Sequence, residues 1–171
     1  MKKAFLIALI ILTGVATKSI AQKLQENKTD DFTKKSVKRT SWEAFTSTGG
    51  PNAHFRISLV GDDETFDFKL MMDKVFSIDQ GRTIILKLDN GDLITIENSA
   101  YAITCNGCGA VGLKGSEAEG IETSYALNKE QIEKLKAHKV LSARISTNDG
   151  YFDADIKDKN AVKLIACLNL L

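Results

Sequence analysis

The sequence predicts an α+β fold, in which an antiparallel, mostly meandering sheet or sandwich carries a mid-chain helix and a C-terminal helix packed on it. From residue 40 to about residue 100, short segments of alternating apolar and polar residues are separated by Gly, Asn and Asp. Strands at this spacing are typical of an antiparallel meander that closes toward a sandwich or barrel. Helical periodicity follows in the last third of the chain, near residues 128–138 and 158–171.

The first strand pair is predicted at residues 55–60 and 65–70. Both segments alternate, and the stretch Gly61–Glu64 between them has the composition of a turn. One face of the second strand is apolar and should turn toward the core, because alternate residues of a strand share a face. The residues of this face are Phe66, Phe68 and Leu70.

The next hairpin joins residues 82–88 to residues 93–96. An Asn-Gly pair at its turn first suggests a two-residue type I′ loop, but that register sets apolar residues opposite Thr95 and Glu97. A three-residue loop, Asp89–Gly91 with a left-handed glycine, instead gives one continuous apolar face. Because the buried face fixes register, we predict the longer loop. Its pairs are Leu86 with Ile94 and Ile84 with Ile96.

A helix is predicted from Asn128 to about residue 138. Asn128 is a suitable N-cap, and Gln131 at the third helical position completes a variant of the capping box. The helical spacing of Ile132 and Leu135 predicts that these two side chains face the core.

A second hairpin is predicted over residues 140–156, with the two-residue loop Asp149-Gly150. A three-residue loop would set Ile145 opposite Asp153 and bury a carboxylate, which is unfavourable. The two-residue loop gives a mostly apolar face and a pair of opposite charges on the other face. Its pairs are Thr147 with Phe152, Ile145 with Ala154, Ala143 with Ile156, and Arg144 with Asp155.

The final helix is expected to begin with Asp158 as its N-cap. Its apolar face should pack on Ile145 and Ile156 and thereby close the core. The residues of that face are Ala161, Leu164, Ile165, Leu168 and Leu171.

The N-terminal residues 1–21 have the pattern of a signal peptide. A positive start precedes the apolar run Ala4–Val15, which is too short to span a bilayer, and Ala21 is the small residue that cleavage requires. We therefore expect an exported protein, periplasmic or extracellular, that begins near Gln22. The first cysteine is Cys105, so no lipoprotein anchor is expected, and no later apolar run predicts a membrane segment.

The rest of the chain is expected to comprise a flexible lead-in over residues 22–40 and a single domain over residues 41–171. The lead-in is polar and without periodicity, which is typical of a solvated segment, and its basic cluster fits the same interpretation. That cluster consists of Lys34, Lys35, Lys38 and Arg39.

The charge of the chain gives no reason to expect nucleic acid or an anionic membrane as a partner. The full sequence has 23 lysines and arginines against 22 aspartates and glutamates, and the expected leader would remove lysines and no acid. Export also argues against chemistry that depends on ATP, GTP or NAD, and no cofactor is expected. The segment Gly107–Gly112 matches G-x-G-x-x-G, but Gly115 argues against a following helix, so we interpret the match as chance.

The pair Cys105 and Cys108 is the motif with the clearest chemical potential, and it has three interpretations. A redox pair would place its first cysteine at a helix N-terminus, which the surrounding glycines disfavour. A zinc site would need further ligands, for which Cys167, His138 or His54 are candidates. A structural disulfide that includes Cys105 or Cys108 suits an oxidising compartment and is the interpretation we adopt, with Cys167 as a further candidate partner.

Other candidate groups have simpler explanations. The two histidines, His54 and His138, do not neighbour a glycine-flanked serine, so no hydrolase constellation is predicted. The acids at residues 62–64 have the residue type of a calcium site but also of a solvated turn. The aromatics Trp42, Phe45 and Phe55 are expected at the core or its edge.

Three stretches of the chain resemble small exported proteins of Bacteroidota that have no assigned activity. They are Thr40–Glu43, Thr104–Ala110, and the ending that includes Asp149–Tyr151 and Asp158–Ala161. The resemblance carries over no catalytic, cofactor or metal residue. The predicted function is an exported, non-enzymatic binding or interaction module for a small ligand or a protein. The alternative is a thiol-redox or metal-binding protein centred on Cys105 and Cys108.

Overall fold

The structure is a computed structural model, and it describes residues 22–46, 52–72, 74–111 and 117–171. The expected signal peptide, residues 1–21, lies outside the described residues, so export and the cleavage position remain predictions. Within the described ranges, no helix combines the length and the apolar composition that crossing a bilayer requires.

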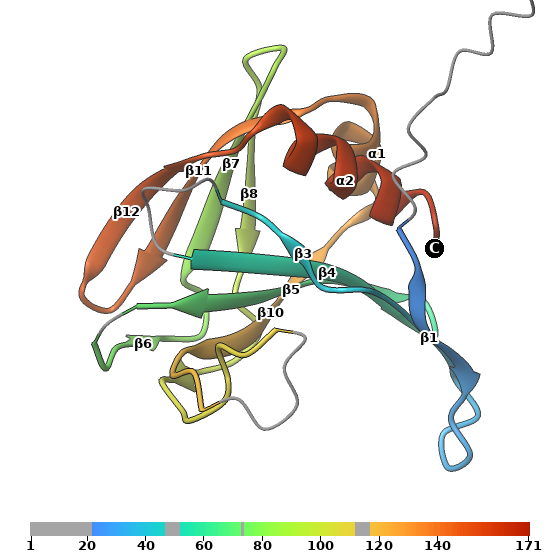
Figure 1. The fold of residues 1–171 in the computed structure, drawn as a ribbon. Helices are drawn as coiled ribbons and strands as arrows, with labels where there is room; N and C mark the ends of the chain where they lie inside the picture. Colours follow the sequence, from blue (N-terminus) through green and yellow to red (C-terminus); the bar gives the residue numbers. More distant parts are fainter. Residues whose placement is uncertain (1–21, 47–51, 73, 112–116) are drawn as a thin grey trace, which may run out of the picture.

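The described residues form antiparallel sheets with one mid-chain and one C-terminal helix, which confirms the predicted α+β class (Figure 1). The larger sheet has the order β1 (Leu24–Thr29), β2 (Ser36–Thr40), β4 (Asn52–Val60), β5 (Asp63–Met71) and β10 (Ile121–Leu127), with β3 (Glu43–Ala44) also paired to β4. The smaller sheet has the order β12 (Gly150–Asp155), β11 (Val140–Thr147), β7 (Thr83–Leu88) and β8 (Leu93–Glu97). A short ribbon pairs β6 (Ser77–Ile78) with β9 (Ala102–Ile103), and the helices are α1 (Lys129–Ala137) and α2 (Asp158–Leu168).

Alternation along the strands builds one core between the two sheets and the helices. As predicted, Phe66, Phe68 and Leu70 share the inward face of β5 and are fully buried. Phe45 packs edge-on against Phe66 with ring centroids 5.4 Å apart, and it makes similar contacts with Phe55 and Phe68. Phe45 and Phe55 are therefore core residues, as the sequence led us to expect.

The two sheets meet at Asn98, just beyond the end of β8. Its backbone bridges to Tyr125 of β10, and its buried amide donates hydrogen bonds to the carbonyl oxygens of Asp79, at 3.1 Å, and Ala100. The amide oxygen accepts a hydrogen bond from the Thr123 hydroxyl. This one side chain thus connects β8, β10 and the segment after β6.

The β7–β8 hairpin has the predicted three-residue loop. Leu86 pairs with Ile94 and Ile84 pairs with Ile96, so the apolar residues form one buried face. Gly91 has a φ of 90°, in the left-handed region that favours glycine. The backbone N–H of Leu88 donates to the carbonyl of Asp92 and closes the loop.

Helix α1 begins as predicted. The Asn128 side chain accepts from the backbone N–H of Gln131, and the Gln131 side chain accepts from the backbone N–H of Asn128, which completes the capping box. Ile132 and Leu135 are buried, as expected. The Gln131 side chain also donates to the carbonyl of Thr95, which fixes α1 against β8.

The predicted register of the C-terminal hairpin is wrong by two residues. The loop is Asn148-Asp149 rather than Asp149-Gly150, because Gly150 already pairs with Thr147. Ile145 consequently lies opposite Phe152, Ala143 opposite Ala154, and Arg144 opposite Asp153. A shift of two residues leaves every side chain on its predicted face, so the buried face does not distinguish these registers.

The predicted cap of the final helix is also wrong. Lys157 occupies the N-cap position but its side chain makes no capping hydrogen bond, and Asp158 is the first residue of α2. The Asp158 carboxylate instead accepts a hydrogen bond from the Lys139 ammonium at 2.6 Å. The buried residues of α2 are Asn160, Ala161, Leu164, Cys167 and Leu168, whereas Ile165 and Leu171 are half-buried.

The expected flexible lead-in over residues 22–40 is instead the β1–β2 hairpin, whose second strand pairs with β4. Asp30 organises its turn by accepting hydrogen bonds from the backbone N–H groups of Phe32 and Thr33. Figure 1 shows this turn extending beyond the body of the sheets. The segment lacks hydrophobic alternation because β1 is an edge strand with little buried surface.

Candidate functional site

The outer face of the larger sheet carries a partly buried polar cluster. Inward positions of β4, β5 and β10 hold mostly apolar side chains, so the alternate positions place Arg56, Asp67, Lys69 and Glu122 together on the opposite face. Asp67 and Lys69 are buried, although they lie on the side of the sheet away from the core.

Asp67 is the centre of this cluster. Its carboxylate accepts hydrogen bonds from Arg56 Nε at 2.8 Å, Ser58 at 2.6 Å, Thr65 at 2.9 Å and Ser124 at 2.8 Å. Burial on its own would raise the pKa of this carboxyl, but the hydrogen bonds from Ser58, Arg56 and Ser124 outweigh it and lower the pKa. Asp67 is therefore an ionised anchor that fixes the position of Arg56.

Trp42 covers the cluster from the segment between β2 and β3. The Arg56 guanidinium lies 4.5 Å from the centre of its ring and the Lys69 ammonium 4.8 Å from it. Lys69 also donates to the carbonyl of Ala110 at 2.7 Å and lies 3.3 Å from Glu122. Trp42 is half-buried and covers the outer face of the sheet, so it does not lie in the core with Phe45 and Phe55.

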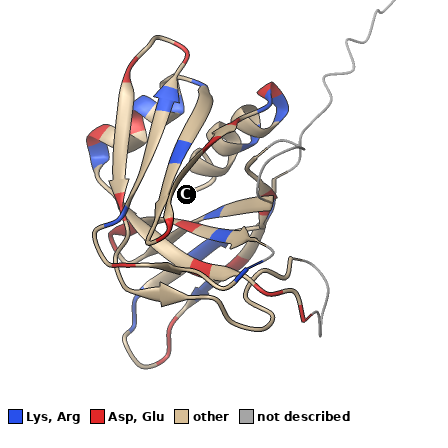
Figure 2. Cartoon of the chain, turned by 90° about the vertical axis from the view of Figure 1, so that its left-hand side faces the viewer, with Lys and Arg blue, Asp and Glu red and all other residues tan. Residues whose placement is uncertain are grey.

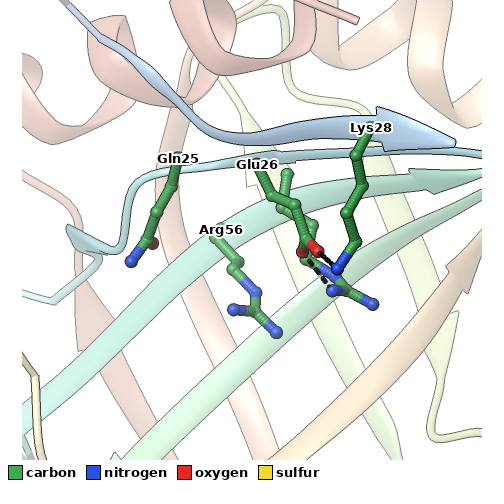
Figure 3. Close-up of a pocket in the computed structure, with 5 residues that line it drawn as sticks. Gln25, Glu26, Lys28 and Arg56 are labelled. Carbon is green, nitrogen blue, oxygen red and sulfur yellow. Dashed lines mark hydrogen bonds and ion pairs between the residues drawn. The ribbon is translucent and has the colours of Figure 1, made fainter. Parts of the chain in front are cut away.

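An open pocket of about 400 Å³ lies beside this cluster, between β1, β2 and β4 (Figure 3). Its described lining comprises Gln25, Glu26, Lys28, Arg39 and Arg56. The pairing of β1 with β2 shifts by one residue at Gln25, which is the signature of a β-bulge. The bulge breaks strict alternation, so the consecutive residues Gln25 and Glu26 both line the pocket.

Positive charge exceeds negative charge in the described lining of this pocket. Lys28, Arg39 and Arg56 face it, and Glu26 supplies the negative charge. Glu26 is shared, because it pairs with Lys28 at 2.7 Å and with the Arg39 guanidinium, and the hydrogen bonds from Lys28 and Arg39 lower its pKa. The wider surface is mixed: Figure 2 shows basic and acidic residues interspersed over the strands.

This arrangement is suited to binding an anion. Guanidinium groups bind carboxylate or other oxyanions through paired hydrogen bonds, and a lysine ammonium and a glutamine amide add further donors. Sequence reasoning missed the site because Gln25, Glu26 and Lys28 lie in the segment expected to be flexible. In the sequence, Arg39 is one member of a basic cluster that is typical of a solvated segment. Arg56 comes beside it only through strand pairing, and such a pairing produces no short sequence motif.

The cysteine pair has a different setting. Cys105 and Cys108 lie at disulfide distance with their Cα atoms 5.5 Å apart, in a turn rather than at a helix N-terminus. Cys105 is also bridged to Gly120 through backbone hydrogen bonds. Cys167 is a free thiol buried in α2, and burial raises its pKa to about 11. The sulfur that lies near Cys105 is therefore that of Cys108, and Cys167 packs in the core.

We predict that replacing both Cys105 and Cys108 with serine lowers the unfolding free energy by about 2 kcal/mol, the value expected for so short a loop. Thermal unfolding followed by circular dichroism measures the effect, with the single variant Cys167→Ser as a comparison. The pocket between β1, β2 and β4 should be unaffected, because its described lining lies on those strands and not near the cysteine turn. A double variant as stable as the wild type would contradict the structural interpretation.

The remaining candidates are dispersed. His138 Nδ1 lies 3.0 Å from Asp89 at the end of α1, whereas His54 lies on β4. Within the described residues, no group of three His, Cys, Asp or Glu side chains is arranged to hold a metal ion. The acids of the turn between β4 and β5 are mostly exposed, and Glu64 is half-buried. Of the G-x-G-x-x-G match, Gly107 lies in the turn that contains Cys108, and Gly112 lies outside the described residues.

Comparisons with protein-family models, curated proteins and solved structures found no match to this chain.

Proposed function

We propose that the chain is an exported, non-enzymatic binding module whose ligand carries a carboxylate or a similar small oxyanion. The observation that carries this proposal is the convergence of Lys28, Arg39 and Arg56 on one open pocket, with Glu26 as the acid of the described lining. A volume of about 400 Å³ is within the range of small-molecule sites. The described lining holds donors for an anion, and among its residues there is no pairing of a nucleophile with a base, which catalysis would need.

The pocket is also preorganised, which favours binding. Arg56 is fixed from below by Asp67 and from the side by the ring of Trp42, so little side-chain entropy is lost when a ligand binds to it. Arg56 has donors beyond the Nε–H that Asp67 engages, because a guanidinium carries five N–H groups, and one of its terminal nitrogens also lies 3.6 Å from the Glu122 carboxylate.

Glu26 would compete with an anionic ligand for the cations of this pocket. Its carboxylate already pairs with Lys28 and Arg39. It therefore occupies the position that the carboxylate of a ligand would take. We therefore propose that a ligand binds by displacing Glu26 from these two cations. This makes the expected effects of two neighbouring substitutions opposite in sign.

We predict that Arg39→Ala weakens the binding of an acidic probe about tenfold or more and that Glu26→Gln strengthens it, because the amide releases Lys28 and Arg39. Isothermal titration calorimetry with citrate, glucuronate and sulfate measures both effects. Arg82→Ala and Glu97→Gln are matched controls, since both residues are exposed and lie outside the described lining. Equal affinities in all variants would reject the pocket as an anion site.

Native mass spectrometry of protein isolated from its own host would identify the ligand directly. An acidic small molecule retained by the wild type and lost in Arg39→Ala supports the proposal. A retained metal ion that disappears when Cys105 and Cys108 are replaced would instead favour the thiol or metal function.

A further inference from the structure

The short ribbon of β6 and β9 carries a row of exposed apolar side chains that ends at the cysteine turn. Exposed and half-buried residues alternate from residue 101 to residue 105, so Tyr101, Ile103 and Cys105 share the outer face of this segment. Tyr101 is 58% exposed and Ile103 is 51% exposed. Figure 1 shows this segment and the cysteine turn (yellow) on the side of the molecule away from α1 and α2.

Val75 lies beside this row on the neighbouring strand. Ser77 pairs with Ile103, and the N–H of Thr104 donates to the carbonyl of Phe76 at 3.1 Å, so the same register sets Val75 opposite Cys105. Phe76 is buried, whereas Val75 is 69% exposed. Val75, Tyr101 and Ile103 therefore form one apolar surface, here called the ribbon patch, which borders Cys105. Large apolar side chains that gather on a surface are typical of a binding site, whereas single ones are not.

The backbone under the ribbon patch is fixed from both sides. The N–H of Cys105 donates to the carbonyl of Gly120 at 2.9 Å, and the N–H of Gly120 donates back at 3.3 Å. On the other side of the ribbon, the N–H of Asn148 donates to the carbonyl of Ser77 at 2.9 Å. A partner at Cys105 would therefore lie across the exposed side chains rather than add a strand at this point.

The two cysteines differ in their access to solvent. Cys105 is exposed and Cys108 is half-buried, and the pair lies at disulfide distance. Exposed disulfides are in general the ones that exchange with other thiols. In such an exchange the attacking thiolate belongs to the partner, and the disulfide is the electrophile. The oxidised pair therefore does not need the helix N-terminus that would lower the pKa of a nucleophilic cysteine.

We propose that the disulfide of Cys105 and Cys108 exchanges with the cysteine thiols of an extended polypeptide that docks on the ribbon patch. Alternate residues of a strand are about 6.6 Å apart, and an extended polypeptide has the same spacing. A segment with apolar residues at alternate positions can therefore contact Tyr101 and Ile103 while its cysteine reaches Cys105. A small thiol has no side chains for the patch to contact, so the patch favours a polypeptide partner.

The exchange has two steps. In the first step, the thiolate sulfur of the partner forms a bond with the Sγ of Cys105, the bond between the two cysteines breaks, and Cys108 leaves as a thiolate that takes a proton from water. In the second step, a second thiolate of the partner attacks the partner's sulfur in this mixed disulfide, and Cys105 leaves and is protonated. The partner gains one disulfide and loses two electrons, which reduce the cysteine pair to two thiols. Each chain performs one exchange without any other oxidant.

Reduction of the oxidised protein by two synthetic peptides tests the proposal. One peptide has a single cysteine flanked by valine at alternate positions, and the other has serine in place of each valine. Mass spectrometry of the alkylated cysteines measures the rate at which an excess of each peptide reduces the disulfide. We expect the valine peptide to react about tenfold faster, which is the effect of burying one or two apolar side chains. The trapped mixed disulfide should be on Cys105.

A variant that carries Val75→Ser together with Ile103→Ser should react with both peptides at the rate of the serine peptide. Its reaction with 2-mercaptoethanol should match that of the wild type, because the disulfide itself is unchanged. Phe32→Ser together with Leu93→Ser is the matched control, since these two residues are exposed and apolar but lie elsewhere. Tyr101→Ser alone decides the matter if the first variant fails to fold.

Equal rates for the two peptides, or an unchanged rate for the valine peptide in the patch variants, would overturn the proposal. So would two free thiols at Cys105 and Cys108 in the oxidised protein, or a mixed disulfide on Cys108. The anion pocket gives an independent result, because its described lining does not include the ribbon patch. Arg39→Ala should exchange with the valine peptide at the wild-type rate, and the patch variants should bind citrate like the wild type.

Discussion

Removal of residues 158–171 is expected to unfold the protein or make it aggregate. Helix α2 buries Ala161, Leu164, Cys167 and Leu168, each at most 2% exposed, against both sheets and α1. Full burial of one leucine side chain contributes roughly 1.5–3 kcal/mol, and the whole stability of a domain is only about 5–15 kcal/mol. Loss of several such side chains, together with exposure of the core beneath them, should exceed that stability.

Polar contacts of α2 add to this effect. The buried Asn160 amide donates to the carbonyl oxygens of Phe45, at 3.1 Å, and Thr46, at 3.3 Å, and these carbonyls would lose their donor. Lys163 would no longer pair with Glu43, whose carboxylate lies 2.6 Å from it. The helix therefore also fixes the segment that leads from β3 into the core.

Circular dichroism and sedimentation of the truncated chain measure the outcome. The substitution Lys159→Ala is the control, because Lys159 is an exposed residue of α2 and should be dispensable. The single substitution Leu164→Ala should lower the unfolding free energy by about 2–5 kcal/mol without abolishing the fold. Cooperative unfolding of the chain lacking residues 158–171 would show that α2 is an appendage rather than part of the core.

The two β-hairpins show what the sequence can and cannot determine about register. At Asp89–Gly91 the two competing registers differ by one residue. One of them would pair Ile84 and Leu86 with polar residues of the partner strand, whereas the observed one pairs them with apolar residues. The need to bury one apolar face therefore selects the register. At the C-terminal hairpin the predicted and observed registers differ by two residues. Both bury Ile145, so hydrophobic alternation cannot separate them, and the choice depends on turn geometry.

The β1–β2 hairpin at the edge of the larger sheet could not be predicted from the sequence for a related reason. Strand β1 lies at the edge and has little buried surface, so its sequence carries no alternation. A local signal was present, since Asp30 and Thr33 have the spacing of a side-chain-capped turn. Nothing local indicates that β2 pairs with β4, and the anion pocket exists only because of that pairing.

Replacement of Asp67 by alanine should lower the unfolding free energy by about 3–5 kcal/mol, the usual effect of breaking a buried ion pair. The substitution leaves the Arg56 Nε–H, which now lies 2.8 Å from the carboxylate, without its acceptor. The hydroxyl groups of Ser58, Thr65 and Ser124 lose the same acceptor. Because Arg56 lines the anion pocket, the variant should also bind acidic probes more weakly, even under conditions in which it remains folded.

The same carboxylate should make the protein sensitive to acid. Burial opposes ionisation of Asp67, but the hydrogen bonds from Ser58, Arg56 and Ser124 outweigh it, so the folded-state pKa lies below the ordinary value of about 3.9. A group whose pKa is lowered by folding contributes its full stabilisation above its unfolded-state pKa and loses it as the pH falls through its folded-state pKa.

Urea unfolding of the wild type and Asp67→Asn between about pH 7 and pH 2 tests this, and the difference in unfolding free energy should shrink below about pH 4. Asp62→Asn, at an exposed position of the turn between β4 and β5, is the control and should follow the wild type throughout. A difference between wild type and Asp67→Asn that stays constant down to pH 2 would mean that Asp67 acts through its shape and not through its charge.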